Sequence, residues 1–236
     1  MNRWTDWNCD LLSSIRIDLS GSEDDACKAL LHLHTACGID RVCMMPTFDP
    51  LHQSTSIFLL KRAAYEDLLK AKLSKELSII FSAKVLLQPG VSEIIDPEHL
   101  VAATGGYLPI VFPAGPYHDW MDVELNRLLY KRKCRLLLMA CERFPIFYEN
   151  ETVEKLFRIP NAIYQFQYRA LADIKTRRIL YNLYRLNKPI LFGTGVDCLQ
   201  KAWDFRPERY QAAALERFSP LEYHRLMRFG THFCER

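Results

Sequence analysis

Long hydrophobic runs are absent from this sequence of 236 residues. The longest apolar stretches, such as residues 136–141 and 190–192, are far shorter than the roughly 20 residues that a helix needs to cross a bilayer. The first residues include Trp4, Asp6 and Asp10, where a secretory signal would have a basic start and an unbroken apolar stretch. We therefore expect a cytoplasmic protein without a membrane span.

Several motifs of catalytic and metal-binding proteins are also missing. The eight cysteines include no C-x-x-C pair, which argues against a zinc ribbon or a disulfide framework and favours a reducing compartment. No cysteine is followed six residues later by arginine, so the loop of the cysteine-based phosphatases is excluded. The sequence has no G-K-[ST], H-E-x-x-H or G-x-S-x-G motif. His32 and His34 fall inside an expected helix, where residues two apart point in different directions.

Composition and charge indicate an ordinary globular chain. Hydrophobic residues make up 49% of the sequence and charged residues 25%, so we expect one domain over residues 1–236. The formal net charge is only +3. The basic cluster at residues 131–135 is typical of a solvated helix end, since a nucleic-acid surface needs a wider basic face interleaved with aromatic residues. We expect no nucleic-acid partner.

Short apolar runs alternate with amphipathic stretches along the chain, the pattern that βα units produce. We expect strands at residues 7–12, 41–45, 77–85, 107–112, 135–141, 162–168 and 189–192. Helices are expected at residues 24–37, 57–77, 120–133, 151–157 and 172–186, and in most of the C-terminal third. This order predicts an α/β protein with mostly parallel strands. A distorted (β/α)7-type barrel fits better than an open doubly wound sheet, and in either case ligands should bind at the carboxyl ends of the strands.

The expected strand ends carry a series of short motifs. The first three are Asp6-Trp7-Asn8-Cys9-Asp10, Met45-Pro46-Thr47 and Ser82-Ala83-Lys84. They are followed by Met139-Ala140-Cys141-Glu142-Arg143-Phe144, Gln165-Phe166-Gln167-Tyr168-Arg169-Ala170-Leu171, Thr194-Gly195-Val196-Asp197 and Arg206-Pro207. In order and spacing this series resembles D-x-H-x-H, T-P-H, G-A-E, A-H-P-E-R-Y, Q-x-N-x-x-S-L, S-D-x-H and R-P-P of the PHP (polymerase and histidinol phosphatase) superfamily. The resemblance is greatest to the bacterial, capsule-associated, manganese-dependent tyrosine phosphatases.

The resemblance implies a metal site that has lost most of its ligands. Family members hold two or three metal ions that activate a hydroxide against a phosphate ester. The matching positions here are Asn8, Asp10, Thr47, Lys84, Ala140, Gly195 and Asp197. Ala140 and Gly195 have no donor atoms, and Lys84 puts an ammonium where the metals would be. We expect no metal, with Lys84 paired to Asp10 or Asp197. The alternative is a single Mg or Mn ion held by Asn8, Asp10 and Asp197.

Two functions follow from this comparison. The first is a catalytically inactive relative that serves as a binding or regulatory module for a phosphate-like anion or a protein partner. Its ligand-binding residues would be Asn8, Thr47, Arg143, Gln165, Gln167, Arg169 and Arg206, although the arginines could equally form salt bridges at the barrel rim. The second is an active phosphatase or hydrolase, acting on phosphotyrosine or another phosphoester, in which Lys84, Asp10 and Asp197 provide acid–base chemistry with an altered metal site.

Overall fold

The computed structural model describes residues 4–11, 22–73, 76–101 and 104–233. The strands are β1 (Trp4–Cys9), β2 (Ile39–Met44), β3 (Thr47–Phe48), β4 (Ser78–Phe81), β5 (Lys84–Leu86), β6 (Tyr107–Val111), β7 (Arg135–Met139), β8 (Ile163–Gln167) and β9 (Ile190–Gly193). All paired strands run parallel, in one sheet of order β1-β2-β4 and another of order β3-β5-β6-β7-β8-β9. The α/β class with parallel strands, predicted from the sequence, is confirmed.

Two interrupted strands join the two sheets. Only Met45 and Pro46 separate β2 from β3, and only Ser82 and Ala83 separate β4 from β5. Backbone hydrogen bonds cross the interruption, from Ser82 N to Met44 O at 2.9 Å and from Lys84 N to Pro46 O at 3.1 Å. The described strands therefore occupy seven positions, namely β1, β2 with β3, β4 with β5, β6, β7, β8 and β9.

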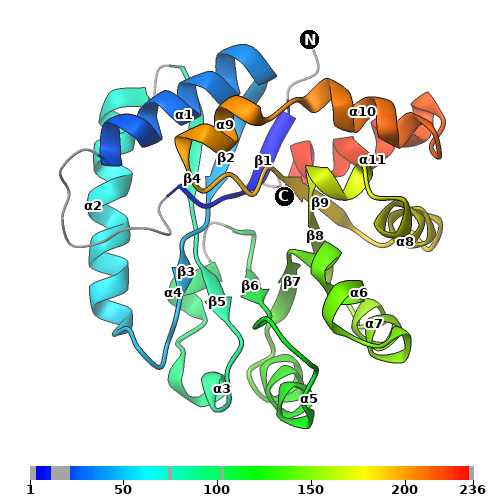
Figure 1. The fold of residues 1–236 in the computed structure, drawn as a ribbon. Coiled ribbons are helices and arrows are strands. Elements are labelled where there is room, and N and C mark those ends of the chain that lie inside the picture. Colours follow the sequence, from blue (N-terminus) through cyan, green and yellow to red (C-terminus); the bar gives the residue numbers. More distant parts are fainter. Residues whose placement is uncertain (1–3, 12–21, 74–75, 102–103, 234–236) are drawn as a thin grey trace.

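The last strand returns to the first. The segment after β9 hydrogen-bonds to the end of β1, from Gly195 N to Asn8 O at 2.9 Å and from Asp10 N to Val196 O at 2.7 Å. A side chain at Gly193 would overlap the backbone of Asn8, so these two segments are in close contact. Figure 1 shows the strands arranged around a common axis, which brings their carboxyl ends together.

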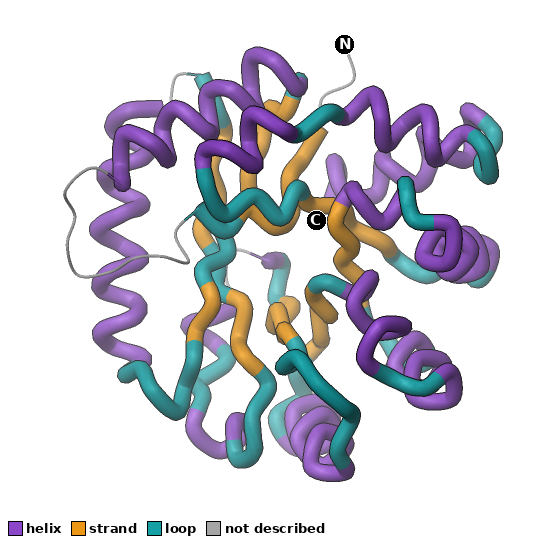
Figure 2. Tube along the Cα trace, viewed as in Figure 1, coloured by secondary structure: helices purple, strands orange, loops and turns teal. Residues whose placement is uncertain are grey.

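Helices form a layer outside the strands (Figure 2). They are α1 (Ser22–Cys37), α2 (Thr55–Leu73), α3 (Val91–Ile94), α4 (Glu98–Val101), α5 (Asp119–Asn126), α6 (Phe144–Phe147), α7 (Asn150–Phe157), α8 (Ile174–Arg185), α9 (Leu199–Asp204), α10 (Pro207–Leu215) and α11 (Pro220–His232). Shorter turns are η2 (Arg127–Lys131), η3 (Cys141–Arg143) and η4 (Tyr168–Leu171). No described helix has the length and apolar character required to cross a membrane.

The core has two parts, one on each face of the strands. Along β7, Leu136 and Leu138 pack toward the helices, whereas Leu137 and Met139 point to the interior, because successive strand residues face opposite sides. The inner part, which we call the interior plug, consists of Trp7, Cys43, Met45, Val111, Leu137, Met139, Ile163, Leu191 and Phe233. These residues fill the space between the two ends of the strands.

Several predicted boundaries need correction. The first strand begins at Trp4 rather than Trp7 and ends at Cys9, and Leu12 lies outside the described residues. The strand expected at residues 77–85 is two strands, because its middle residues bridge to the other interrupted strand. The segment between β5 and β6, where no helix was expected, contains α3 and α4. The helix expected at residues 120–133 changes after Asn126 into the π-helical turn η2.

Candidate functional site

A cavity of about 530 Å³ lies where the strands end, and we call it the carboxyl-end cavity. Its described wall consists of Asn8, Asp10, Thr47, Lys84, Val111, Met139, Ala140, Arg143, Gln167, Arg169, Thr194, Gly195, Val196, Asp197, Lys201, Asp204, Phe205 and Tyr210. The carboxyl ends of parallel barrel strands are where sites of this fold class form. Most residues that the sequence singled out therefore lie around one space.

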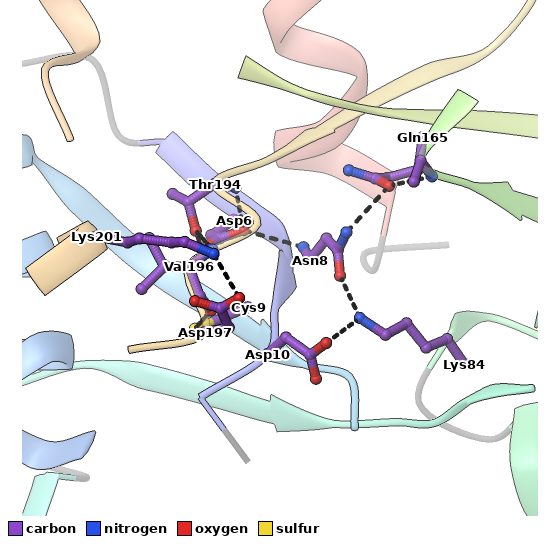
Figure 3. Close-up of polar contacts among 11 residues, drawn as sticks. Asp6, Asn8, Cys9, Asp10, Lys84, Gln165, Thr194, Val196, Asp197 and Lys201 are labelled. Atoms are coloured by element: carbon purple, nitrogen blue, oxygen red, sulfur yellow. Dashed lines mark hydrogen bonds and ion pairs between the residues drawn. The ribbon is translucent and has the colours of Figure 1, made fainter. Parts of the chain in front are cut away.

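Lys84 is the central cation of this cavity. It is the first residue of β5, pairs with Thr47 of β3, and is only 7% exposed. Its Nζ lies 2.5 Å from Asp10 Oδ2 and 3.3 Å from Asn8 Oδ1 (Figure 3). Of the two partners predicted for Lys84, the structure therefore selects Asp10. Both side chains are largely removed from solvent, so each charge depends on the other for compensation.

A buried amide network holds Asn8 in one orientation. Asn8 Nδ2 donates to Gln165 Oε1 at 3.4 Å, and the same oxygen accepts the backbone N–H of Ala140 at 2.9 Å. Gln165 Nε2 donates to the carbonyl of Phe166 at 2.7 Å. Because both ends of the Gln165 amide are assigned, Asn8 must turn its oxygen toward Lys84. Gln165 is fully buried behind Asn8 and does not belong to the described cavity wall, so the structure places it beside Asn8 rather than at the cavity surface.

Asp6 connects the first and last strands beneath the cavity. Its Oδ1 accepts the backbone N–H groups of Asn8 at 3.0 Å and Thr194 at 2.8 Å, and its Oδ2 accepts the Thr194 hydroxyl at 2.5 Å. Burial raises the pKa of Asp6, and these hydrogen bonds partly oppose that rise. The sequence comparison had placed Asp6 in a motif without a role. The hydrogen bonds of Asp6 give this residue a structural role, because they fix the backbone that carries Asn8.

Asp10 is the carboxylate best placed to exchange a proton. Burial raises its pKa, and the ammonium of Lys84 lowers it by less, so the net shift is upward. Its Oδ1 is buried and has no hydrogen-bond partner among the described residues. One oxygen of Asp10 is thus committed to Lys84, and the other keeps its capacity to accept a hydrogen bond.

Asp197 is paired differently from the sequence expectation. Its Oδ2 lies 2.5 Å from Nζ of Lys201, one helical turn further on in α9. Their side chains are 39% and 58% exposed, so this pair is much more solvated than that of Lys84 and Asp10. Asp197 lines the cavity, as expected, but Lys201 is the cation that it contacts. Sequence reasoning missed Lys201, although its spacing of four residues from Asp197 was a usable signal.

The predicted arginines have different positions. Arg143 and Arg169 line the cavity, together with Thr47 and Gln167. The guanidinium of Arg143 lies over the ring of Phe147, 5.3 Å from its centroid. Arg206 instead donates to the carbonyls of Trp203 and Phe205, and does not belong to the described wall. The guanidinium of Arg206 is thus used by the local backbone, outside the group of cations around the cavity.

Glu142 anchors the region around these arginines. Its Oε2 accepts the backbone N–H of Gln167 at 3.1 Å, and its Oε1 lies 3.7 Å from Nη2 of Arg169. Burial raises the pKa of Glu142, with smaller opposing contributions from that hydrogen bond and from Arg169 and Arg143. At 3.7 Å the contact with Arg169 is a loose ion pair, and the Arg169 side chain is 63% exposed. Arg169 is therefore able to turn toward a ligand.

The donor set does not fit the metal cluster that the resemblance implies. Ala140 and Gly195 offer no side-chain donor, and the Lys84 ammonium already contacts the oxygens of Asn8 and Asp10 that would have to bind a cation. A divalent ion beside that ammonium would be repelled at contact distance. Among the described residues, no group of three or more His, Cys, Asp or Glu side chains is arranged to hold a metal ion.

Gly195 lies against Gln167 in the described wall of the cavity. It stands where the resembling motif S-D-x-H has aspartate, and its φ is +65°, a left-handed conformation that favours glycine. A Cβ at this position would overlap the side-chain amide of Gln167. Gln167 therefore occupies the space that a ligand side chain from residue 195 would need.

Comparison with known proteins places the fold among metal-dependent phosphatases. No protein-family model and no curated protein matches the sequence. A chain from the crystal structures of YwqE from Bacillus subtilis and CpsB from Streptococcus pneumoniae, metal-dependent tyrosine phosphatases, superposes with a TM-score of 0.67 and 16% identity, over 96% of this chain and 95% of that one. The superposition therefore includes nearly the whole of both chains.

Two further solved structures are similar. Histidinol phosphate phosphatase HisK from Lactococcus lactis, complexed with zinc, L-histidinol and phosphate, gives a TM-score of 0.57 at 14% identity, over 91% of this chain and 93% of that one. N-isopropylammelide isopropylaminohydrolase from Burkholderia multivorans gives 0.54 at 11% identity, over 91% and 72%. At these identities the likeness is one of fold. The chain shares its fold with the two phosphatases and with the aminohydrolase, which confirms the predicted resemblance at the level of the fold.

Proposed function

We propose that this protein is a metal-independent binding module for a phosphate-like anion, derived from the phosphatase fold. The observation that carries the proposal is the position of the Lys84 ammonium, between Asn8 Oδ1 at 3.3 Å and Asp10 Oδ2 at 2.5 Å. A fixed monovalent cation at the end of the strands supplies part of the positive charge that metals supply to a phosphate in the similar structures. It does not supply a metal-activated hydroxide.

The rest of the cavity supports an anionic ligand. Lys84, Arg143, Arg169 and Lys201 are its cations, and Asp10, Asp197 and Asp204 are the carboxylates of its described wall. Lys84 and Lys201 have carboxylate partners within 2.5 Å, whereas Arg143 lies against an aromatic ring and Arg169 forms a loose pair. The two guanidinium groups are thus the cations that can close on a ligand, and their planar fork matches the oxygens of a phosphate.

The decisive experiment measures anion binding in the absence of metal. The protein is treated with EDTA and titrated calorimetrically with inorganic phosphate and with phenyl phosphate, and its metal content is determined by mass spectrometry. We expect binding without added metal, and at least a tenfold loss of affinity in Arg143→Gln/Arg169→Gln. Arg206→Gln is the matched control and should bind like the wild type. Binding that appears only with manganese, or a stoichiometric tightly held metal, would overturn the proposal.

A second candidate function is catalysis by the Lys84–Asp10 pair. It is favoured by the buried and unpartnered Oδ1 of Asp10 and by the raised pKa of its carboxyl group. A carboxylate with these properties can accept a proton from an attacking water, while the neighbouring ammonium stabilises developing negative charge on the substrate. This candidate requires a phosphoester or related substrate in the same cavity.

Turnover distinguishes the two candidates. The EDTA-treated protein is assayed against p-nitrophenyl phosphate, phosphotyrosine and a wider ester panel, with and without manganese. Metal-free turnover that is lost in Asp10→Asn would establish the catalytic candidate. Anion binding without turnover of any ester would leave the binding module as the function.

A further inference from the structure

A second cavity, of about 770 Å³, lies at the opposite end of the strands. Tyr107, Arg135 and Ile163 are the first residues of β6, β7 and β8, and Pro189 directly precedes β9. These residues line the cavity together with Gly105, Arg225, Arg228, Phe229 and Phe233. We call this space the amino-end cavity. The interior plug separates it from the carboxyl-end cavity, because Ile163 and Phe233 of the plug face one cavity and Val111 and Met139 face the other.

The local backbone holds Arg135 in a fixed position. Its guanidinium lies over the Tyr107 ring at 4.4 Å from the centroid and donates to the carbonyl of Gly105 at 2.5 Å. Gly106 has φ +81°, and a Cβ on it would come within 2.7 Å of Arg135 Nη2. The Gly105–Gly106 turn therefore provides both a hydrogen-bond acceptor and the space that the guanidinium occupies. A cation held in this way is preorganised for binding.

Two more arginines come from α11. Arg225 and Arg228 are three residues apart and so lie on the same side of the helix, next to Phe229. The helix is fixed at both ends, by the capping box between Ser219 and Glu222 and by the hydrogen bond from Trp7 Nε1 to Gly230 O at 3.0 Å. Glu222, the carboxylate one turn before Arg225, caps the helix through Ser219 N and Oγ at 2.8 and 2.9 Å.

The remaining wall is aromatic and aliphatic. Phe233 packs against Tyr107 at 5.5 Å and against Phe229 at 5.9 Å between ring centroids. On its other side it meets Trp7 of the plug at 5.0 Å. No Asp or Glu belongs to the described wall, whereas three arginines do. The described wall of the carboxyl-end cavity has charges of both signs, so the described parts of the two cavities differ in this respect.

We propose that the amino-end cavity binds a phosphorylated ligand that carries a planar ring, of the size of a nucleoside diphosphate. Arginine forks contact phosphate oxygens in pairs, and aromatic rings that line a cavity accept a flat ring by stacking or edge contact. Cavities of roughly 300–1,000 Å³ accommodate ligands of this size. The proposal is independent of the function proposed for the carboxyl-end cavity, since the two share no wall residue.

The test uses ADP as the probe, with adenosine and inorganic pyrophosphate as its two halves. Calorimetric titration of the full-length, EDTA-treated protein should give ADP a lower Kd than either half. Arg225→Gln/Arg228→Gln should weaken ADP binding at least tenfold and leave phosphate binding at the carboxyl-end cavity unchanged. Both arginines are exposed, so this variant should fold. Arg158→Gln/Arg178→Gln removes two exposed charges elsewhere and is the matched control.

Other results would contradict the proposal. Failure of ADP to bind would show that the arginines do not form a nucleotide site. Equal weakening by both double variants would show that the arginines act only through the net charge of the protein. Pyrophosphate binding as tight as that of ADP would remove the ring from the ligand class. Loss of ADP binding in Arg143→Gln/Arg169→Gln, with no effect of Arg225→Gln/Arg228→Gln, would assign the nucleotide to the carboxyl-end cavity instead.

Discussion

Lys84 at the carboxyl end of the strands is buried, whereas the arginines at the amino end are exposed. At the carboxyl end, Lys84 is buried and lies 2.5 Å from the carboxylate of Asp10. At the amino end, Arg135, Arg225 and Arg228 line a cavity whose described wall has no carboxylate. A buried charge needs an opposite charge beside it, so Lys84 and Asp10 depend on each other in the folded chain. The arginines at the amino end are exposed, so their charges do not require a buried partner.

Removing the buried ammonium should have the largest effect on the molecule. In Lys84→Met, Asp10 is left buried without its counter-charge, and we expect a loss of about 3–5 kcal/mol in the free energy of unfolding. Urea denaturation followed by circular dichroism measures this loss. Lys84→Met/Asp10→Leu, which removes both charges, should recover most of it. Equal stability of Lys84→Met and the wild type would show that the pair is not desolvated as its geometry implies.

The solvated pair in the same cavity provides the matched comparison. Lys201→Met removes the cation that contacts Asp197, but both side chains are more than a third exposed, at 58% and 39%. Exposed ion pairs contribute about 0–1 kcal/mol, so this variant should be nearly as stable as the wild type. A loss as large as that of Lys84→Met would remove the distinction between the two pairs.

A second and smaller effect is expected at the amino end. Gly105 and Gly106 both have positive φ, but a Cβ meets nothing within 4 Å at Gly105, whereas at Gly106 it meets the tip of Arg135. Each alanine variant should therefore lose about 1–2 kcal/mol from backbone conformation. Only Gly106→Ala should also weaken ADP binding, because it displaces the guanidinium. Calorimetry on both variants checks this, and equal ADP affinities would show that Arg135 is not a ligand contact.

The last expected effect is a dependence of binding on pH at the carboxyl end. Burial raises the pKa of Asp10 above its ordinary value of 3.8. Asp10 therefore takes up a proton at a higher pH than an exposed aspartate does. Protonated Asp10 no longer competes for Lys84. Sulfate affinity should therefore rise as the pH falls from about 7 to about 4.5, by at most about tenfold per pH unit for one linked proton.

The titration is done in the Arg225→Gln/Arg228→Gln background, so that the carboxyl-end cavity alone is measured. With Asp10→Asn in that background the affinity should be higher at neutral pH and should vary less with pH. Any remaining slope would come from Asp6 and Glu142, whose pKa values are also raised by burial. A sulfate affinity that falls on acidification would contradict the assignment of Asp10 as the competing anion.

The strand positions of the fold could be predicted because parallel strands are buried on both faces and appear as short apolar runs. The interruptions at Pro46 and at Ser82 could not, since they depend on hydrogen bonds between segments far apart in the sequence. The π-helical turn η2 was missed for a similar reason. Its residues have an ordinary amphipathic pattern, and nothing in that pattern distinguishes an α-helical from a π-helical turn.

The candidate site could be predicted as a list of residues but not as a set of contacts. Strand-end motifs placed Asn8, Lys84 and Asp197 around one cavity. The choice of Asp10 as the partner of Lys84 depends on distances across the barrel, which the sequence does not contain. Gln165 and Arg206 were assigned to the ligand from motif positions alone. Their amide and guanidinium groups are instead used by neighbouring protein atoms.

The contact between residue 195 and Gln167 makes these two positions interdependent. Any side chain at residue 195 would have to displace the Gln167 amide, and its backbone at φ +65° would cost an L-residue about 1–2 kcal/mol. An aspartate engineered at residue 195 would therefore need room made at residue 167. A divalent ion beside that aspartate would also need Lys84 to be replaced, because the ammonium would repel the ion.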